Sequence, residues 1–307
     1  MIDFNKILPI ARVVPGITRS FFMKRPCTVS FDVTSSCSLN CDYCYFKYTD
    51  PGRQLSEDEM LDRIRQVAGE FTAYHASFVG GEPTLRPRLL EEAVKLFPHT
   101  WILTNGVRGF PENIKASAWV VSLDGTEDIH DGFKGKGIHK RVLKNINKSQ
   151  SMIFSNTTVS KKNHHCLEDL AEEMKDTNLS YMTFSFYTPV GSGDNGGSDD
   201  FALSDAEKIS ILGRISDLRK KYPSFIFFSP LMEYYYHPGK GYHRWNSTEN
   251  CPVAIIGRHY GADGKLQLPC AMGPTADCSA CGCGMNAIFL ALIHGDINAM
   301  RILMDLI

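Results

Sequence analysis

The chain has 307 residues, of which 43% are hydrophobic and 22% charged, and its formal net charge is −1. This length allows one large α/β domain with a small additional module. The near-zero charge excludes the global basic field that attracts nucleic acid, and no acidic excess indicates disorder. The longest apolar runs are too short to span a membrane.

Residues 1–27 differ in character from the rest of the chain. Apolar side chains are interleaved there with Lys and Arg, and Pro9 and Pro15 break the run into short pieces. We expect an apolar, basic arm that packs as a strap across the fold. The alternative is an interfacial arm that contacts a hydrophobic substrate or a membrane surface, which would make the protein membrane-peripheral.

After this arm, short β-branched and aromatic runs alternate with helical patterns. The predicted strands are Thr28–Val33, His75–Val79, Thr100–Thr104, Trp119–Leu123, Met152–Val159 and Tyr181–Tyr187, with an edge strand at Phe225–Phe228. The predicted helices are Ser56–Phe71, Pro87–Phe97, Pro111–Ser117, Lys140–Lys148, Leu167–Thr177 and Ser204–Lys221. Ser56 and Ser204 are each followed three residues later by Glu, which is the capping-box pattern.

Strict alternation of strand and helix indicates right-handed crossovers and a parallel sheet. The six main strands are too few to close an eight-stranded barrel, so the predicted fold is α/β, a partial (β/α)6 TIM barrel over residues 28–229. Active-site groups are then expected at the carboxyl ends of the strands. Gly191–Ser198 follows the sixth strand, as either a lid or a plain surface loop. Residues 230–307 are predicted to form a small cysteine-rich module with terminal helices at Ala287–Ile293 and Asn298–Leu306.

The chain has ten cysteines, and most of them fall into two groups. No secretory signal pattern precedes the first group, so we expect a cytoplasmic protein whose clustered thiols bind metal rather than form disulfides. Cys37, Cys41 and Cys44 have the spacing C-x3-C-x2-C directly after the first predicted strand. Three thiolates on one loop can hold three corners of an iron–sulfur cubane and leave the fourth iron open for chemistry. The alternative is a structural zinc knuckle with a ligand from elsewhere.

The pattern C-x3-C-x-aromatic-C, with Tyr43 as its aromatic residue, resembles the signature of radical S-adenosylmethionine (SAM) enzymes. The resemblance implies that the open iron of a [4Fe–4S] cluster chelates the amine and carboxylate of SAM. An electron from a reducing partner such as flavodoxin or ferredoxin then cleaves SAM. The resulting 5′-deoxyadenosyl radical abstracts hydrogen from a substrate or adds to it.

Motifs on later strands agree with this resemblance. Gly80-Gly81-Glu82-Pro83 resembles the GGE motif of the superfamily, in which glycines allow a close approach of the backbone. Glu82, or the adjacent backbone, is expected to accept hydrogen bonds from the methionyl ammonium group. By the same resemblance, the SAM pocket is expected to include Asn105, Ser122 and Asp124, with Thr157 as a weaker candidate. No residue is assigned as catalytic.

The second cysteine group comprises Cys251, Cys270, Cys278, Cys281 and Cys283. A turn signal, Ala-Asp-Gly-Lys, precedes Cys270 and predicts a hairpin. The group resembles the auxiliary-cluster modules of SPASM or twitch type, which implies a second [4Fe–4S] cluster. We expect the first four cysteines as ligands, with Cys283 as a competitor because residues two apart on an extended chain point to the same side. The alternatives are zinc or plain thiols.

The substrate is less well defined by the sequence. The basic arm, the Ser-Leu-Asp-Gly segment followed by Ile129-His130-Asp131, and the cysteine-rich tail resemble adenosylhopane-synthase-like enzymes, which implies an isoprenoid lipid substrate. Tetraether-lipid synthases share radical chemistry on hydrophobic chains. The rival hypotheses are a maturase that acts on a peptide or protein, a cofactor-biosynthesis enzyme of molybdopterin or haem type, and a zinc-stapled binding protein without enzymatic activity.

Overall fold

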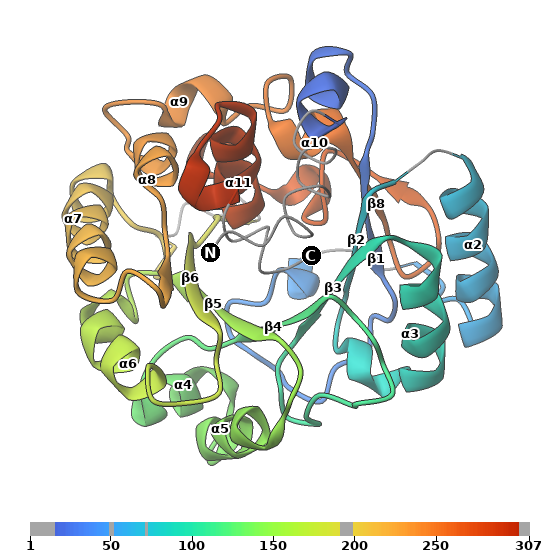
Figure 1. Cartoon of the computed structure of the whole chain (residues 1–307), viewed down its shortest axis with the longest axis horizontal. Coiled ribbons are helices and arrows are strands. Elements are labelled where there is room, and N and C mark those ends of the chain that lie inside the picture. Colours follow the sequence, from blue (N-terminus) through green and yellow to red (C-terminus); the bar gives the residue numbers. More distant parts are fainter. Residues whose placement is uncertain (1–15, 49–51, 71–72, 191–198, 301–307) are drawn as a thin grey trace, which may run out of the picture.

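The computed structural model describes residues 16–48, 52–70, 73–190 and 199–300. Within them the chain forms a nine-stranded sheet in the order β7-β6-β5-β4-β3-β2-β1-β8-β9 (Figure 1). Every neighbouring pair is parallel except β8 and β9. The predicted loop Gly191–Ser198, the first part of the arm and the end of the last predicted helix lie outside the described residues.

The predicted strands are confirmed to within one residue at either end. The observed strands are β1 (Thr28–Asp32), β2 (His75–Val79), β3 (His99–Thr104), β4 (Ala118–Ser122), β5 (Ile153–Val159), β6 (Tyr181–Phe186), β7 (Ile226–Phe227), β8 (Gly257–Tyr260) and β9 (Leu266–Gln267). The sheet curves and stays open, as expected for a partial barrel (Figure 1). The predicted edge strand is β7, and the predicted hairpin joins β8 to β9 with Gly264 at a φ of 74°.

Most helices follow the predicted pattern and lie outside the curved sheet (Figure 1). They are α2 (Glu57–Glu70), α3 (Pro87–Ala93), α4 (Glu127–Lys134), α5 (Ile138–Lys148), α6 (Leu167–Met174), α7 (Asp205–Lys221), α8 (Pro230–Tyr236), α9 (Tyr242–Trp245), α10 (Pro252–Ile256) and α11 (Gly284–Ile293). Short 3₁₀ helices are η1 (Tyr45–Tyr48), η2 (Pro83–Leu85), η3 (Val94–Leu96), η4 (His164–Cys166), η5 (Gly273–Thr275) and η6 (Cys278–Ala280).

One predicted helix is absent, because the segment Pro111–Ser117 forms turns instead. Four observed helices, α4, α8, α9 and α10, were not predicted. The capping boxes, in contrast, are confirmed at both expected positions. The Glu59 and Glu207 amides donate to the hydroxyls of Ser56 and Ser204, and each Glu carboxylate accepts from the backbone amide of its Ser.

Residues 230–307 are joined to the barrel through the sheet itself. β8 pairs with β1 in parallel, with Ser30 opposite His259. The elements α8 to α11 lie on the side that the sheet leaves open, where α10 contacts β8 and α11 contacts β6 (Figure 1). Of the predicted arm, residues 16–22 are helical, and Phe21 packs against Trp245 with ring centroids 6.1 Å apart. No helix in the described residues has the length and apolar character needed to cross a bilayer.

Candidate active site

The loop that carries the first cysteine group is clamped by the end of β2. The Gly81 amide donates to the Thr34 carbonyl (2.7 Å), and the Glu82 amide donates to the Ser36 carbonyl (2.8 Å). Gly80 has a φ of 124°, and a Cβ at Gly80 or Gly81 would collide with those carbonyl oxygens. The two glycines are therefore required because the backbone just before Cys37 passes directly against them.

The Glu82 carboxylate is fully buried and accepts four hydrogen bonds from the protein. One oxygen accepts from the Thr84 amide (3.0 Å) and from the hydroxyls of Thr84 and Thr104 (both 2.7 Å). The other accepts from the Asn105 amide (2.8 Å). Glu82 also caps η2, whose first residue, Pro83, is buried. The side chain thus braces the ends of β2 and β3.

The three thiols of the first group lie within electrostatic reach of one another. Cys37 is exposed, while Cys41 and Cys44 are partly buried. Burial raises the pKa of Cys41 to about 11, with Lys134 opposing this rise and the other two thiols adding to it. In the described part of the chain, no three His, Cys, Asp or Glu side chains are grouped closely enough to hold a metal ion. As a donor set, three thiols on one loop suit a cubane bound at three corners.

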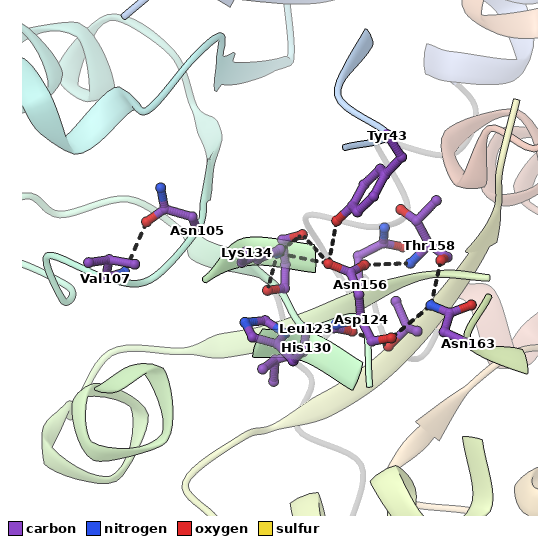
Figure 2. Close-up of polar contacts among 12 residues, drawn as sticks. Tyr43, Asn105, Val107, Leu123, Asp124, His130, Lys134, Asn156, Thr158 and Asn163 are labelled. Carbon is purple, nitrogen blue, oxygen red and sulfur yellow. Dashed lines mark hydrogen bonds and ion pairs between the residues drawn. The ribbon is translucent and has the colours of Figure 1, made fainter. Parts of the chain in front are cut away.

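A buried polar cluster lies beside the cysteine loop, at the end of β4 (Figure 2). Lys134 Nζ lies 2.8 Å from Asp124 Oδ2, and the two side chains are only 2% and 1% exposed. The same ammonium group donates to the hydroxyl (2.7 Å) and carbonyl (2.9 Å) of Ser122. The Tyr43 hydroxyl donates to Asp124, so the cluster ties the cysteine loop to the sheet. Burial alone would raise the pKa of Asp124, but the charge of Lys134 and the hydrogen bonds from Lys134 and Tyr43 outweigh it and lower this pKa.

Further polar groups fix the backbone and carboxylate of Asp124 (Figure 2). The Asn163 side-chain amide donates to the Asp124 carbonyl (2.7 Å), and the Thr158 amide donates to its carboxylate (3.3 Å). The Asp124 amide donates to His130 Nδ1 (3.2 Å). Burial lowers the pKa of His130 to about 3, which keeps this nitrogen unprotonated and able to accept.

Of the two other predicted SAM-pocket residues, Asn105 lies beside the cysteine loop and Thr157 is buried. Asn105 reaches the cysteine loop, because its Nδ2 lies 3.8 Å from Cys37 Sγ while its Oδ1 accepts from the Val107 amide (3.0 Å). Thr157 is fully buried, and its hydroxyl donates to the Leu123 carbonyl (2.6 Å). Sequence reasoning missed Lys134 and Asn163. Lys134 lies on α4, so a prediction of that helix would have placed it near Asp124.

The five cysteines of the second group all line one cavity of about 360 Å³. Burial raises the pKa of Cys251 to about 12 and that of Cys270 to about 11, and in both cases the Cys283 thiol adds to the rise. Cys283 also raises the pKa of Cys281, after burial. Cys283, the competitor named from the sequence, thus lines the same cavity as the other four cysteines. Cys278 acts on the pKa of Cys270.

Comparisons with known proteins agree with this geometry. Residues 31–174 match the family model described as the Radical SAM superfamily. An AdoMet-dependent heme synthase of Methanosarcina barkeri is 32% identical over 60% of this chain and 56% of its own length. Mycofactocin maturase MftC of Mycolicibacterium smegmatis is 27% identical over 51% of this chain and 42% of its own length. The chain thus spans about half the length of these relatives.

Solved structures share the fold. SuiB of Streptococcus suis bound to S-adenosylmethionine superposes with a TM-score of 0.62 at 16% identity, over 81% of this chain and 61% of that one. SuiB has also been solved with its precursor peptide SuiA, with the same TM-score of 0.62 at 15% identity, over 89% of this chain and 66% of that one. At such identities the likeness concerns the fold alone.

Proposed function

We propose that the chain, whose residues 31–174 match the Radical SAM superfamily model, is an enzyme in which Cys37, Cys41 and Cys44 hold a [4Fe–4S] cluster. The observation that carries the proposal is the anchoring of the cysteine loop. The 80–83 segment clamps it at one end, and the bond from Tyr43 to Asp124 ties it to β4. When bound, the cluster supplies the electron that cleaves SAM to a 5′-deoxyadenosyl radical.

We propose that SAM lies over the carboxyl ends of β2 to β4. Asn105 supports this placement because its amide lies beside the Cys37 thiol. The backbone next to Glu82 is the proposed acceptor for the SAM ammonium group, since the carboxylate is fully buried and already accepts four hydrogen bonds from the protein. Lys134 neutralises Asp124 and donates a hydrogen bond to the Ser122 hydroxyl. These contacts keep the polar groups at the end of β4 oriented before the ligand binds.

A peptide or protein is the substrate that we propose. The relatives include a maturase, and the similar SuiB fold binds a precursor peptide. The heme synthase supports a second candidate, cofactor biosynthesis of the haem type. None of the relatives reported above is named for a lipid, so the isoprenoid lipid substrate stays a prediction from the sequence.

We also propose that residues 230–307 act as an auxiliary module with a second [4Fe–4S] cluster, with zinc as the alternative. The support is that five thiols line one cavity, which is more than one cluster needs. Because Cys283 acts on the pKa of three of its neighbours, it is as strong a ligand candidate as Cys278. A flavodoxin-like or ferredoxin-like protein is the proposed reducing partner.

Substitution of one first-group cysteine tests the function and the second site together. After anaerobic reconstitution with iron and sulfide, the unmodified protein should form 5′-deoxyadenosine from SAM on reduction. Cys41→Ala should form none, because two thiolates do not hold the cubane, yet it should keep the iron of the second site. Cys27→Ala is the matched control, since Cys27 is buried and belongs to neither group, and it should keep both properties.

Each result decides one point. Production of 5′-deoxyadenosine by Cys41→Ala at the unmodified rate would contradict the assignment of the first group. Zinc instead of iron in that variant would support the zinc alternative for the second group. With an active preparation, SAM consumption that depends on added peptides, lipids or porphyrin precursors then separates the substrate classes.

A further inference from the structure

A second cluster of hydrogen-bonded polar side chains lies in the barrel interior, where β1 pairs with β8. Ser30 Oγ lies 2.8 Å from His259 Nδ1, and His259 Nε2 lies 3.0 Å from Asp32 Oδ2. The strand register explains the arrangement, because Ser30 pairs directly with His259 and Asp32 follows two residues later on the same face of β1. Ser30 and His259 line the cavity that also contains the second cysteine group.

The hydrogen bonds define the direction in which a proton can move. A carboxylate only accepts, so His259 Nε2–H donates to Asp32, and Nδ1 of the neutral imidazole carries no hydrogen. Nδ1 then accepts from the Ser30 hydroxyl, whose remaining lone pairs are free for a group in the cavity. A hydroxyl bonded to an imidazole, which a carboxylate orients in turn, is the arrangement that activates a hydroxyl for proton transfer.

This arrangement is more than the packing of the strands requires. Interior positions of such barrels are mostly filled by branched apolar side chains. Here Asp32 is 3% exposed and His259 also 3%, and Asp32 Oδ1 has no hydrogen-bond partner in the described residues. A buried carboxylate oxygen without a partner is destabilising, and such groups in native proteins call for an explanation.

The surrounding cavity wall is largely apolar. Val29, Leu103, Met272, Met285 and Phe289 contribute to it. Apolar walls with a few convergent polar groups are typical of sites for small molecules or single side chains, and a volume of about 360 Å³ lies in the range of such sites. The ligand that fits this wall is an apolar or aromatic group with one ionisable hydroxyl.

We propose that Ser30, His259 and Asp32 form an acid–base relay for a substrate of this class. The substrate hydroxyl gives its proton to Ser30 Oγ while the Ser30 proton moves to His259 Nδ1. The substrate becomes an oxyanion, the imidazolium is stabilised by Asp32, and no electron changes hands. The inference deepens the proposed function and depends on it, because the same cavity would receive the substrate of the radical.

The test uses 4-nitrophenol, an aromatic hydroxyl compound whose ionised form absorbs visible light. It is added to the metal-free protein under anaerobic conditions, at a pH one unit below the pKa of the free probe. Binding next to the relay should raise the ionised fraction saturably, with an apparent shift of about one pKa unit, which is roughly a tenfold change in the ionisation equilibrium. His259→Gln should return the fraction to that of the free probe.

Variants separate the relay from the other titratable groups of the cavity, which include Tyr45, His75, Arg258 and the cysteines. Ser30→Ala and Asp32→Asn should each lower the shift several-fold, Asp32→Asn because a positioning residue is lost. Ser77→Ala is matched to Ser30→Ala, since Ser77 lines the same cavity and bonds to a different histidine, and it should leave the shift unchanged.

A saturable ionisation signal that depends on His259 supports the relay. Absence of such a signal, or an equal signal in Ser30→Ala, overturns it. Ser30→Ala removes one oxygen, so it keeps the test valid if His259→Gln does not fold. The experiment needs neither cluster nor SAM, so its failure would leave the proposed SAM cleavage untouched.

Discussion

At the scale of single residues, the candidate site depends on an ion pair that is almost fully buried. The side chains of Asp124 and Lys134 are no more than 2% exposed, so each charge relies on the other and on hydrogen bonds rather than on water. Burial raises the pKa of Asp124, but the charge of Lys134 and the hydrogen bonds from Lys134 and Tyr43 lower it, and the net shift is downward. A carboxyl group whose folded-state pKa is depressed stabilises the fold above its unfolded-state pKa, and this contribution is lost as pH falls through the folded-state value.

Removal of the Lys134 charge should therefore reverse the pH dependence. Lys134→Met leaves Asp124 buried and unpaired, which should destabilise the fold by about 3–5 kcal/mol at neutral pH. Without Lys134, burial dominates and raises the pKa of Asp124 above its unfolded value. The loss of stability should then shrink as pH falls towards about 4, where the carboxyl group protonates in both states. Urea unfolding at several pH values measures this.

The double variant is the control for that explanation. Lys134→Met combined with Asp124→Asn removes both charges, so it should recover much of the lost stability at neutral pH and show little dependence on pH in the acidic range. If the double variant were as unstable as Lys134→Met alone, lost packing of the lysine chain would be the cause, rather than the unpaired charge.

At the scale of elements, the sequence predicted the strands of the barrel better than the contacts of the site. Buried parallel strands are short apolar runs between turn signals, and such runs can be recognised in a sequence. The helix α4 was missed because it has only eight residues, of which Ile129 and Phe133 alone are large and apolar, and Gly132 lies between them. Missing α4 also hid Lys134, the partner of Asp124.

The structural role of Gly80 and Gly81 was predicted only in part. The sequence indicated a close approach at Gly80 and Gly81, but not that the neighbour is the cysteine loop of the same chain. Likewise, the Glu82 carboxylate was predicted as a ligand group or a neighbour of one, and its four protein donors could not be read from spacing. Contacts between segments far apart in the chain depend on tertiary structure, which local patterns do not encode.

Substitution of Gly81 should therefore disturb the cysteine loop while the barrel stays folded. In Gly81→Ala the new Cβ meets the Ser36 backbone, so the loop must move and the bond from Glu82 to Ser36 is strained. We expect reconstituted iron at the first site to fall several-fold while far-ultraviolet circular dichroism is retained. Gly69→Ala is the control, because a Cβ there meets nothing within 4 Å and α2 should gain up to about 1 kcal/mol. Equal iron loss in both variants would contradict this role of Gly81.

At the scale of the whole molecule, the sheet crosses the boundary that the sequence places at residue 230. β8 was not predicted because it has only four residues, Gly-Arg-His-Tyr, and its partner β1 lies more than two hundred residues earlier in the chain. The pairing brings His259 to Ser30 and closes one side of the cavity. The division into a barrel at 28–229 and a module at 230–307 is thus a proposal about function. The hydrogen-bonded ladder of the sheet is continuous across this division.

A continuous ladder predicts that both parts unfold together. Trp119 on β4 and Trp245 at the end of α9 report on the two sides of the boundary. In metal-free protein labelled with fluorotryptophan, the fluorine signals of both residues should disappear at the same urea concentration, because loss of the β1–β8 pairing exposes the core of each part. Trp245→Phe assigns its signal. If the Trp245 signal changed at a clearly lower urea concentration than that of Trp119, residues 230–307 would be an independently unfolding unit, and the shared cavity wall would not stabilise the barrel.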